Sequence, residues 1–117
     1  MPDLLFPKEK GKGKKKKHRG SIIQPKDGTC YLCMKLHDDY RSKYTEEHHV
    51  YMGHGQRAVS EAEGFKIYVC AEHHRTGPEA VHRNHTVCLM VQQDVQKAFE
   101  RTHSREEFMK LIGRSYL

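Results

Sequence analysis

Two short pairs of metal-binding residues, far apart in the sequence, constrain the fold of this chain more than any other feature. The first pair has the spacing C-x-x-C and the second C-x-x-H, and the four residues are Cys30, Cys33, Cys70 and His73. Thiolate and imidazole ligands in two such pairs are typical of a closed tetrahedral zinc site. We therefore predict a structural Zn²⁺. Cys88 and His74 are the alternatives to His73, but Cys88 falls in a predicted helix, where a small buried residue is the simpler interpretation.

The small size of the chain makes such a metal useful. Its 117 residues have room for one domain, with 36% apolar residues and no Trp. A core of this size gives a domain little stability, and a structural metal is a common remedy. The zinc would attach the predicted hairpin to the helix that follows it.

The excess positive charge lies at the start of the chain. The formal net charge is +6, yet residues 21–117 contain 13 Lys or Arg and 13 Asp or Glu. The low-complexity, basic start predicts a disordered arm over residues 1–26, followed by a folded domain over residues 27–117. The arm would bind nucleic-acid phosphates non-specifically through Lys14, Lys15, Lys16, Lys17 and Arg19. The alternative is a solvated tail or a localisation signal.

Composition also indicates a cellular compartment. No apolar run reaches the roughly 20 residues that a membrane span requires, and the basic start lacks the hydrophobic segment of a secretory signal. Three of the four cysteines stand in ligand spacing, which argues against a disulfide framework. We predict a reducing, cytoplasmic setting and no membrane partner.

Apolar periodicity and turn residues predict an α+β domain. The expected elements are a turn at 27–34, strands at 47–52 and 65–69, a short helix or turn at 58–62, a helical start at 71–75, and helices at 86–102 and 105–112. The two strands would pair as a hairpin with a long loop. Ser104 and Glu107 predict a capping box for the last helix, which Gly113 ends.

A second group of histidines is not needed by the zinc site. His48 and His49 are neighbours on a predicted strand, where adjacent side chains point to opposite faces. One of them can therefore bind an ion while the other stays free beside a phosphate. His74 can face the hairpin and complete the second metal site, and His82 could return to the same place. Ordinary surface or hydrogen-bonded histidines are expected at His37, His54, His85 and His103.

The order of these motifs resembles that of the HNH endonucleases, which have a ββα-metal core. The resemblance rests on C-x-x-C, on a strand with x-His-His-Val, and on Val69-Cys70-Ala71-Glu72-His73-His74 with Val81-His82 downstream. It covers about residues 28–85 and is closest to small phage-encoded HNH proteins, including the recombination-enhancement (Ref-like) nucleases. It implies a small zinc-stapled ββα-metal core, treble-clef-like, followed by C-terminal helices.

The resemblance also implies a role for each histidine. His49 matches the general base of the family, and His48 matches the first ligand of a catalytic ion. His74 matches the last histidine of the motif, which is also a ligand, and His82 is the expected third ligand. The ion would be Mg²⁺, Mn²⁺, Ni²⁺ or Zn²⁺.

One position departs from the family pattern. The family has an Asn a few residues before the second ligand pair, whereas Phe65 and Lys66 occupy that place here. Asn84 could substitute for it. Arg75, directly after a ligand, could bind a non-bridging phosphate oxygen, and a solvated helix residue is the alternative.

Together these roles imply a metal-dependent DNA endonuclease, a hydrolase that nicks phosphodiester bonds and leaves 5′-phosphate and 3′-hydroxyl ends. The implied setting is the host cytoplasm, with DNA as substrate and a recombination or packaging protein as a further partner. The main alternative is a non-catalytic zinc module that binds nucleic acid through its basic arm. A second alternative is an adaptor with a degenerate nuclease core. Only the enzyme requires His49.

Overall fold

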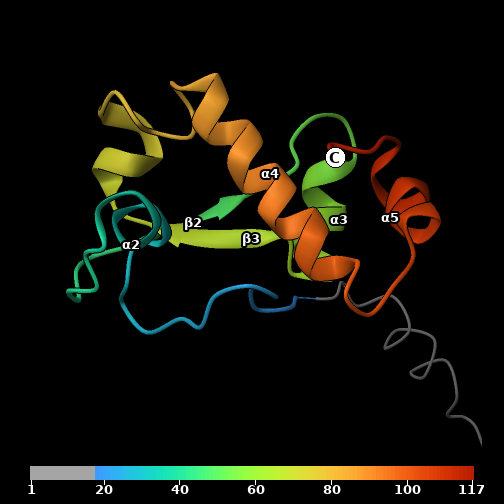
Figure 1. Ribbon diagram of the computed structural model, residues 1–117, viewed down its shortest axis with the longest axis horizontal. Helices are drawn as coiled ribbons and strands as arrows, with labels where there is room; N and C mark the ends of the chain where they lie inside the picture. Colours follow the sequence, from blue (N-terminus) through green and yellow to red (C-terminus); the bar gives the residue numbers. More distant parts are fainter. Residues whose placement is uncertain (1–17) are drawn as a thin grey trace, which may run out of the picture.

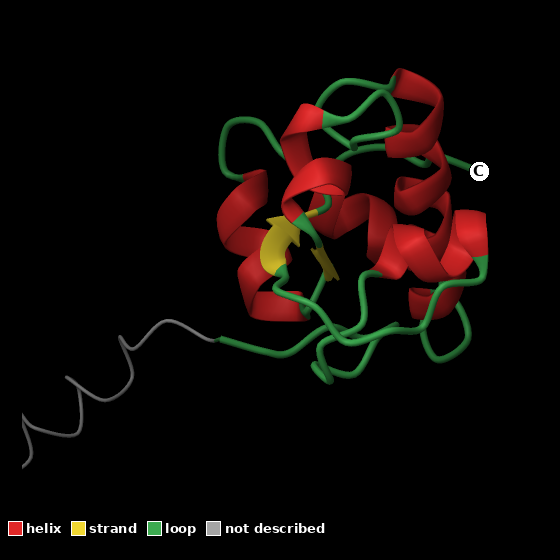
Figure 2. Ribbon diagram, turned by 90° about the vertical axis from the view of Figure 1, so that its left-hand side faces the viewer, coloured by secondary structure: helices red, strands yellow, loops and turns green. Residues whose placement is uncertain are grey.

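The computed structural model describes residues 18–117. Its elements are, in chain order, α2 (Tyr31–His37), β2 (Glu46–His49), α3 (Gln56–Glu63), β3 (Lys66–Val69), the π-helical turn η1 (Glu72–Thr76), α4 (His85–Phe99) and α5 (Arg105–Ile112). The two strands pair antiparallel, and Figures 1 and 2 show helices on both sides of them. This arrangement confirms the predicted α+β class. None of the helices within residues 18–117 combines the length and apolar character needed to cross a membrane.

The hairpin is shorter than predicted on its first strand. His48 lies opposite Ile67 and His49 opposite Lys66, and the ladder ends there. Tyr51 is fully buried, and its ring packs against Phe65 and Phe108 at centroid distances of 5.4 Å each. The chain therefore leaves the strand after His49 to place Tyr51 in the core.

The first ligand pair lies at the start of a helix and not in a simple turn. Cys30 is the N-cap of α2, and its sulfur accepts a hydrogen bond from the backbone N–H of Cys33. The helix ends at Asp38, which has a left-handed conformation with φ of 54°. An N-cap residue needs an extended backbone and a side-chain acceptor, and a thiolate supplies the acceptor here.

The segment before α2 corrects the predicted arm boundary at residue 26. Ile22 and Ile23 pack against the core. Gln24 is buried, its amide nitrogen donates to the carbonyl of Thr29 over 2.7 Å, and its amide oxygen accepts from the N–H of Tyr68 over 2.8 Å. These contacts place residues 22–24 in the folded domain, along the lower side of the hairpin in Figure 1. Lys14–Lys17 lie outside the described residues.

The core joins the hairpin to the last two helices. It contains apolar residues of α2, β3, α4 and α5, and Val59 of α3 packs against it. Its largest aromatic contacts are among Tyr51, Phe65, Phe99 and Phe108. α4 ends at Phe99, three residues before the predicted 102, because the chain turns there toward α5. α5 has the predicted bounds, the predicted capping box of Ser104 and Glu107, and Gly113 as its C-cap. These helices pack against the hairpin and stabilise it.

Candidate metal centres

The four predicted zinc ligands converge in the structure. The sulfurs of Cys30, Cys33 and Cys70 lie 3.6, 3.3 and 3.5 Å from Nδ1 of His73, and the sulfurs of Cys33 and Cys70 lie 3.9 Å apart. Zn–S and Zn–N bonds of about 2.3 and 2.05 Å in a tetrahedron require S–N and S–S separations of about 3.6 and 3.8 Å. The four residues thus lie close enough to bind a metal such as zinc. Cys88 is not part of this group.

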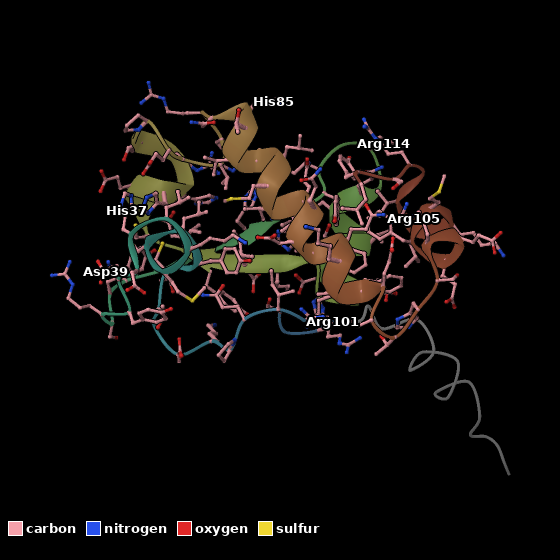
Figure 3. All side chains as sticks on the ribbon, in the orientation of Figure 1. His37, Asp39, His85, Arg101, Arg105 and Arg114 are labelled. Atoms are coloured by element: carbon pink, nitrogen blue, oxygen red, sulfur yellow. The ribbon has the colours of Figure 1, made fainter. Side chains whose placement is uncertain are left out.

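The surroundings of this group place a cation beside one sulfur and carboxylate and aromatic contacts around the imidazole. Nζ of Lys43 lies 3.2 Å from the sulfur of Cys33. On the other side, Nε2 of His73 is 3.6 Å from a carboxylate oxygen of Glu79. The ring of His37 stacks on that of His73, and its Nε2 is 2.7 Å from Glu79. Figure 3 labels His37 beside α2, at the end of the molecule where this group lies. A carboxylate behind a ligating histidine fixes the orientation of its ring.

A second group of potential ligands consists of His48, His74 and His82. Their ring centroids lie 5.5, 4.9 and 4.8 Å apart, and the Nε2 atoms of His74 and His82 are 3.2 Å apart. Two nitrogens bound to one ion at about 2.05 Å would be roughly 2.9 to 3.4 Å apart, for octahedral to tetrahedral geometry. His74 and His82 therefore have the spacing of two ligands of one ion, and a ring nitrogen of His48 lies within 4.8 Å of theirs.

Backbone contacts explain how residues from three segments meet. The π-helical turn η1 carries His73 and His74 as neighbours, so one can turn to each metal group. After Gly77 and Pro78 the chain returns along η1, and the N–H groups of Val81 and His82 donate to the carbonyls of His73 and His74 over 2.9 and 3.3 Å. This return places His82 beside His74.

Burial favours the metal-binding form of two of these histidines. It lowers the pKa of His48 to about 3, and it also lowers the pKa of His82. Nδ1 of His74 lies 2.6 Å from a carboxylate oxygen of Glu46, and its Nε2 faces that of His82. Only a neutral imidazole ligates a metal. The carboxylate behind His74 has the position of an outer-shell partner.

His49 belongs to neither group. Its Nε2 donates to a carboxylate oxygen of Glu61 on α3 over 2.7 Å. The same oxygen lies 2.7 Å from Nζ of Lys66. Hydrogen bonds from Lys66, His49 and His18 lower the pKa of Glu61 to about 2, so this carboxylate is charged at neutral pH. His49 is thereby oriented by an ionised partner.

His49 nevertheless shares a cavity with the second histidine group. A cavity of about 120 Å³ is lined by Glu47, His48, His49, Met52, Arg57, His74, Arg75 and His82. Within residues 18–117, neither Arg57 nor Arg75 forms an ion pair. The cavity therefore combines three potential ligands, a separate imidazole and two guanidinium groups that no carboxylate of the described residues pairs with.

Glu47, His49 and Glu61 also approach one another closely enough for a cation. The ammonium group of Lys66 already lies between the two carboxylates, 3.3 Å from Glu47 and 2.7 Å from Glu61. Lys66 is almost fully buried there. A side-chain cation thus already lies between these two carboxylates, and these residues do not indicate a further metal.

Two of the other residues considered in the sequence, Asn84 and Phe65, have structural roles. Asn84 caps α4, because its side-chain oxygen accepts from the N–H of Val87 over 3.1 Å. Phe65 lies in the core. Arg75 and Arg19 are exposed. Sequence reasoning missed Glu46, Glu61 and Arg57. Only Glu46 had a signal, since it stands two residues before His48 on the same face of a strand.

Comparison of the chain with protein-family models, with curated proteins and with solved structures finds no match.

Proposed function

We propose that this protein is a metal-dependent DNA endonuclease of the HNH type. The observation that carries the proposal is the shared cavity, in which His48, His74 and His82 converge beside His49. A histidine cluster with an open ligand position suits a catalytic ion. The adjacent imidazole, excluded from both ligand groups, suits a general base.

In this proposal the two ligand groups have different tasks. A zinc ion bound by Cys30, Cys33, Cys70 and His73 is structural, because four protein ligands close its coordination. The ion bound by the three histidines is Mg²⁺, Mn²⁺, Ni²⁺ or Zn²⁺. When bound, it polarises the phosphoryl oxygen and stabilises the charge on the leaving 3′-oxygen.

The residues around the ion supply the remaining chemistry. The Nε2–H group of His49 donates a hydrogen bond to Glu61, which leaves Nδ1 to accept the proton of the attacking water. The ionised carboxylate of Glu61 stabilises the imidazolium that forms. The guanidinium of Arg75, which has no ion-pair partner within residues 18–117, neutralises a non-bridging phosphate oxygen. The basic arm, with Lys14–Lys17 and Arg19, adds sequence-independent affinity for DNA.

A plasmid-nicking assay tests the proposal. Zinc-loaded protein is incubated with supercoiled plasmid and Mn²⁺, Mg²⁺ or Ni²⁺, and His49→Ala is compared with His54→Ala. A general base contributes about 10²–10⁴-fold, so His49→Ala should lose nicking by at least about 100-fold. His54 is exposed and lies outside both ligand groups, so its variant should nick normally. DNA ligase should reseal the nicks.

Two outcomes contradict the enzyme. Equal nicking by wild type and His49→Ala would trace the activity to a contaminant. DNA binding without nicking under any of the three metals would favour the non-catalytic zinc module.

A further inference from the structure

A second, larger cavity opens beside the one that contains the histidine cluster. Its volume is about 790 Å³, within the range of about 300–1,000 Å³ for small-ligand sites. It is lined by His18, Glu47, His49, Gly55, Arg57, Ala58, Glu61 and Ala62. Glu47, His49 and Arg57 line both cavities. The two cavities therefore adjoin at these three residues, and we refer to the pair of cavities, from the histidine cluster past His49 to α3, as the groove.

The groove contains one guanidinium group that no carboxylate pairs with among residues 18–117. The carboxylates of Glu47 and Glu61 both contact the buried ammonium group of Lys66, and Glu61 also accepts from His18 and His49. Arg57 is exposed and forms no ion pair or side-chain hydrogen bond within residues 18–117. By contrast, Arg41 and Arg105 bind carboxylates of Asp39 and Glu100. The guanidinium of Arg57 is therefore available to an anion that enters the groove.

The far wall of the groove lies where the basic arm joins the domain. His18 lines the cavity, its Nδ1 lies 2.8 Å from Glu61, and the N–H of Arg19 donates to the carbonyl of Glu61 over 3.1 Å. The chain segment that precedes His18 contains Lys14–Lys17. A polyanionic strand that follows the groove away from the histidine cluster would thus approach the attachment point of the most basic segment of the chain.

The side chains of the α3 wall leave room for such a strand. Gly55, Ala58 and Ala62 are the small residues in the lining, and two of them present methyl groups. A sugar or base can pack on methyl groups while a guanidinium binds the phosphate beside it. The groove therefore suits one nucleotide: its small residues can contact the sugar or base, and its guanidinium group can bind the phosphate.

We propose that this groove binds the nucleotide next to the scissile phosphate, and that Arg57 binds the phosphate of that nucleotide. The proposal rests on the proposed endonuclease function, because it assigns the reacting phosphate to the histidine cluster. Arg75 lines only the smaller cavity, whereas Arg57 lines both. Arg57 is thus the residue that directs the strand from the reacting phosphate toward α3 and the basic arm.

The salt dependence of DNA binding tests this role. Binding of a fluorescein-labelled single-stranded oligonucleotide is measured by fluorescence anisotropy over a range of salt concentrations, with zinc-loaded His49→Ala protein and Mn²⁺, so that the strand stays intact. Each phosphate contact contributes about 0.7 to the slope of log affinity against log salt for single strands. Arg57→Gln should lower this slope by about 0.7, equally for two unrelated sequences, because phosphate contacts carry no sequence information.

Two further variants separate this role from an effect on folding. Arg57→Lys retains a cation and should keep the slope of the parent. Arg101→Gln is the matched control, since Arg101 is exposed, forms no ion pair within residues 18–117, and lies near α5 at the end of α4 (Figure 3). It should also keep the slope. Bound zinc per chain confirms that each variant is folded.

An unchanged slope for Arg57→Gln overturns the proposal, as does an equal loss in Arg101→Gln or an absence of binding by the parent. The nicking assay on wild-type protein is independent of these measurements. Normal nicking with an unchanged slope would contradict the Arg57 site alone. An Arg57-dependent slope without nicking would contradict the endonuclease and leave the strand-binding groove.

Discussion

Replacement of Glu46 should weaken the second metal site without affecting the zinc site. A carboxylate oxygen of Glu46 lies 2.6 Å from Nδ1 of His74, and the hydrogen bond to His74 is the largest cause of the lowered pKa of Glu46. The side chain of Glu46 is 32% exposed and that of His74 is 9% exposed. The pair is therefore shielded enough from water for its orientation of the ring to affect metal binding.

The expected magnitude follows from the kind of contact that is lost. Loss of an outer-shell partner costs about 10- to 100-fold in metal affinity, which is about 1.4 to 2.7 kcal/mol. Glu46→Gln keeps an acceptor for the Nδ1 proton but loses the charge, and charge-assisted hydrogen bonds are about twice as strong as neutral ones. We expect a loss of about 10-fold for Glu46→Gln and nearer 100-fold for Glu46→Ala.

Isothermal titration of zinc-loaded protein with Mn²⁺ or Ni²⁺ measures this loss. Glu47→Gln is the matched control, because Glu47 is adjacent in the strand but contacts Lys66 and not His74. Glu47 contacts none of the three histidines, and a single ion pair with a carboxylate as exposed as that of Glu47 is worth about 1 kcal/mol, so Glu47→Gln should change the affinity by less than about fivefold. Equal affinities for Glu46→Ala and wild type would refute the assignment of Glu46, as would an equal loss in Glu47→Gln.

Two more predictions concern stability. Removal of zinc by a strong chelator should unfold the domain, since structural zinc contributes about 10–16 kcal/mol of binding free energy against a typical total stability of about 5–15 kcal/mol. Circular dichroism should show the loss of structure for wild type and Cys88→Ser, and Cys33→Ser should bind zinc poorly before any chelator is added. Retained native structure in the chelated protein would contradict a structural zinc. The pKa of the Glu61 carboxyl is lowered from 4.5 to about 2 in the folded protein, so its contribution to stability is present above pH 4.5 and is lost as pH falls toward 2. Urea unfolding should show a smaller fall in stability over this interval for Glu61→Gln than for wild type. Identical pH profiles of the two proteins would disprove this role of Glu61.

Local sequence patterns predicted those parts of the fold that depend on local interactions. α5 has the expected bounds because its cap, its first-turn acid and its terminal glycine act within a few residues of one another. The four ligands Cys30, Cys33, Cys70 and His73 could be proposed from spacing alone, because a C-x-x-C pair and a C-x-x-H pair each bring two ligands together in one turn. The second strand was likewise visible in the β-branched and aromatic residues of 65–69, whereas β2 consists of glutamates and histidines and begins one residue before its predicted start.

Contacts between side chains far apart in the sequence could not be predicted from such local patterns. Glu61 lies on α3 and meets His49 only because the long loop after β2 folds back over the hairpin. The burial of Gln24 was also hidden, since a polar residue next to a basic segment reads as solvated. Its amide instead bonds the backbone of Tyr68 and Thr29, which satisfies the polar atoms that burial would otherwise leave unpaired.

The adjacent histidines of η1 join the two metal groups into one unit. His73 directs Nδ1 to the three cysteine sulfurs, and His74 directs Nε2 to His82. The backbone of the same turn accepts from Val81 and His82, so the position of His82 depends on that of His73. Binding of zinc by His73 should therefore fix the turn that carries His74 and holds His82 beside it. If the proposed endonuclease is correct, a domain with so small a core positions its catalytic centre through the coordination geometry of a structural metal.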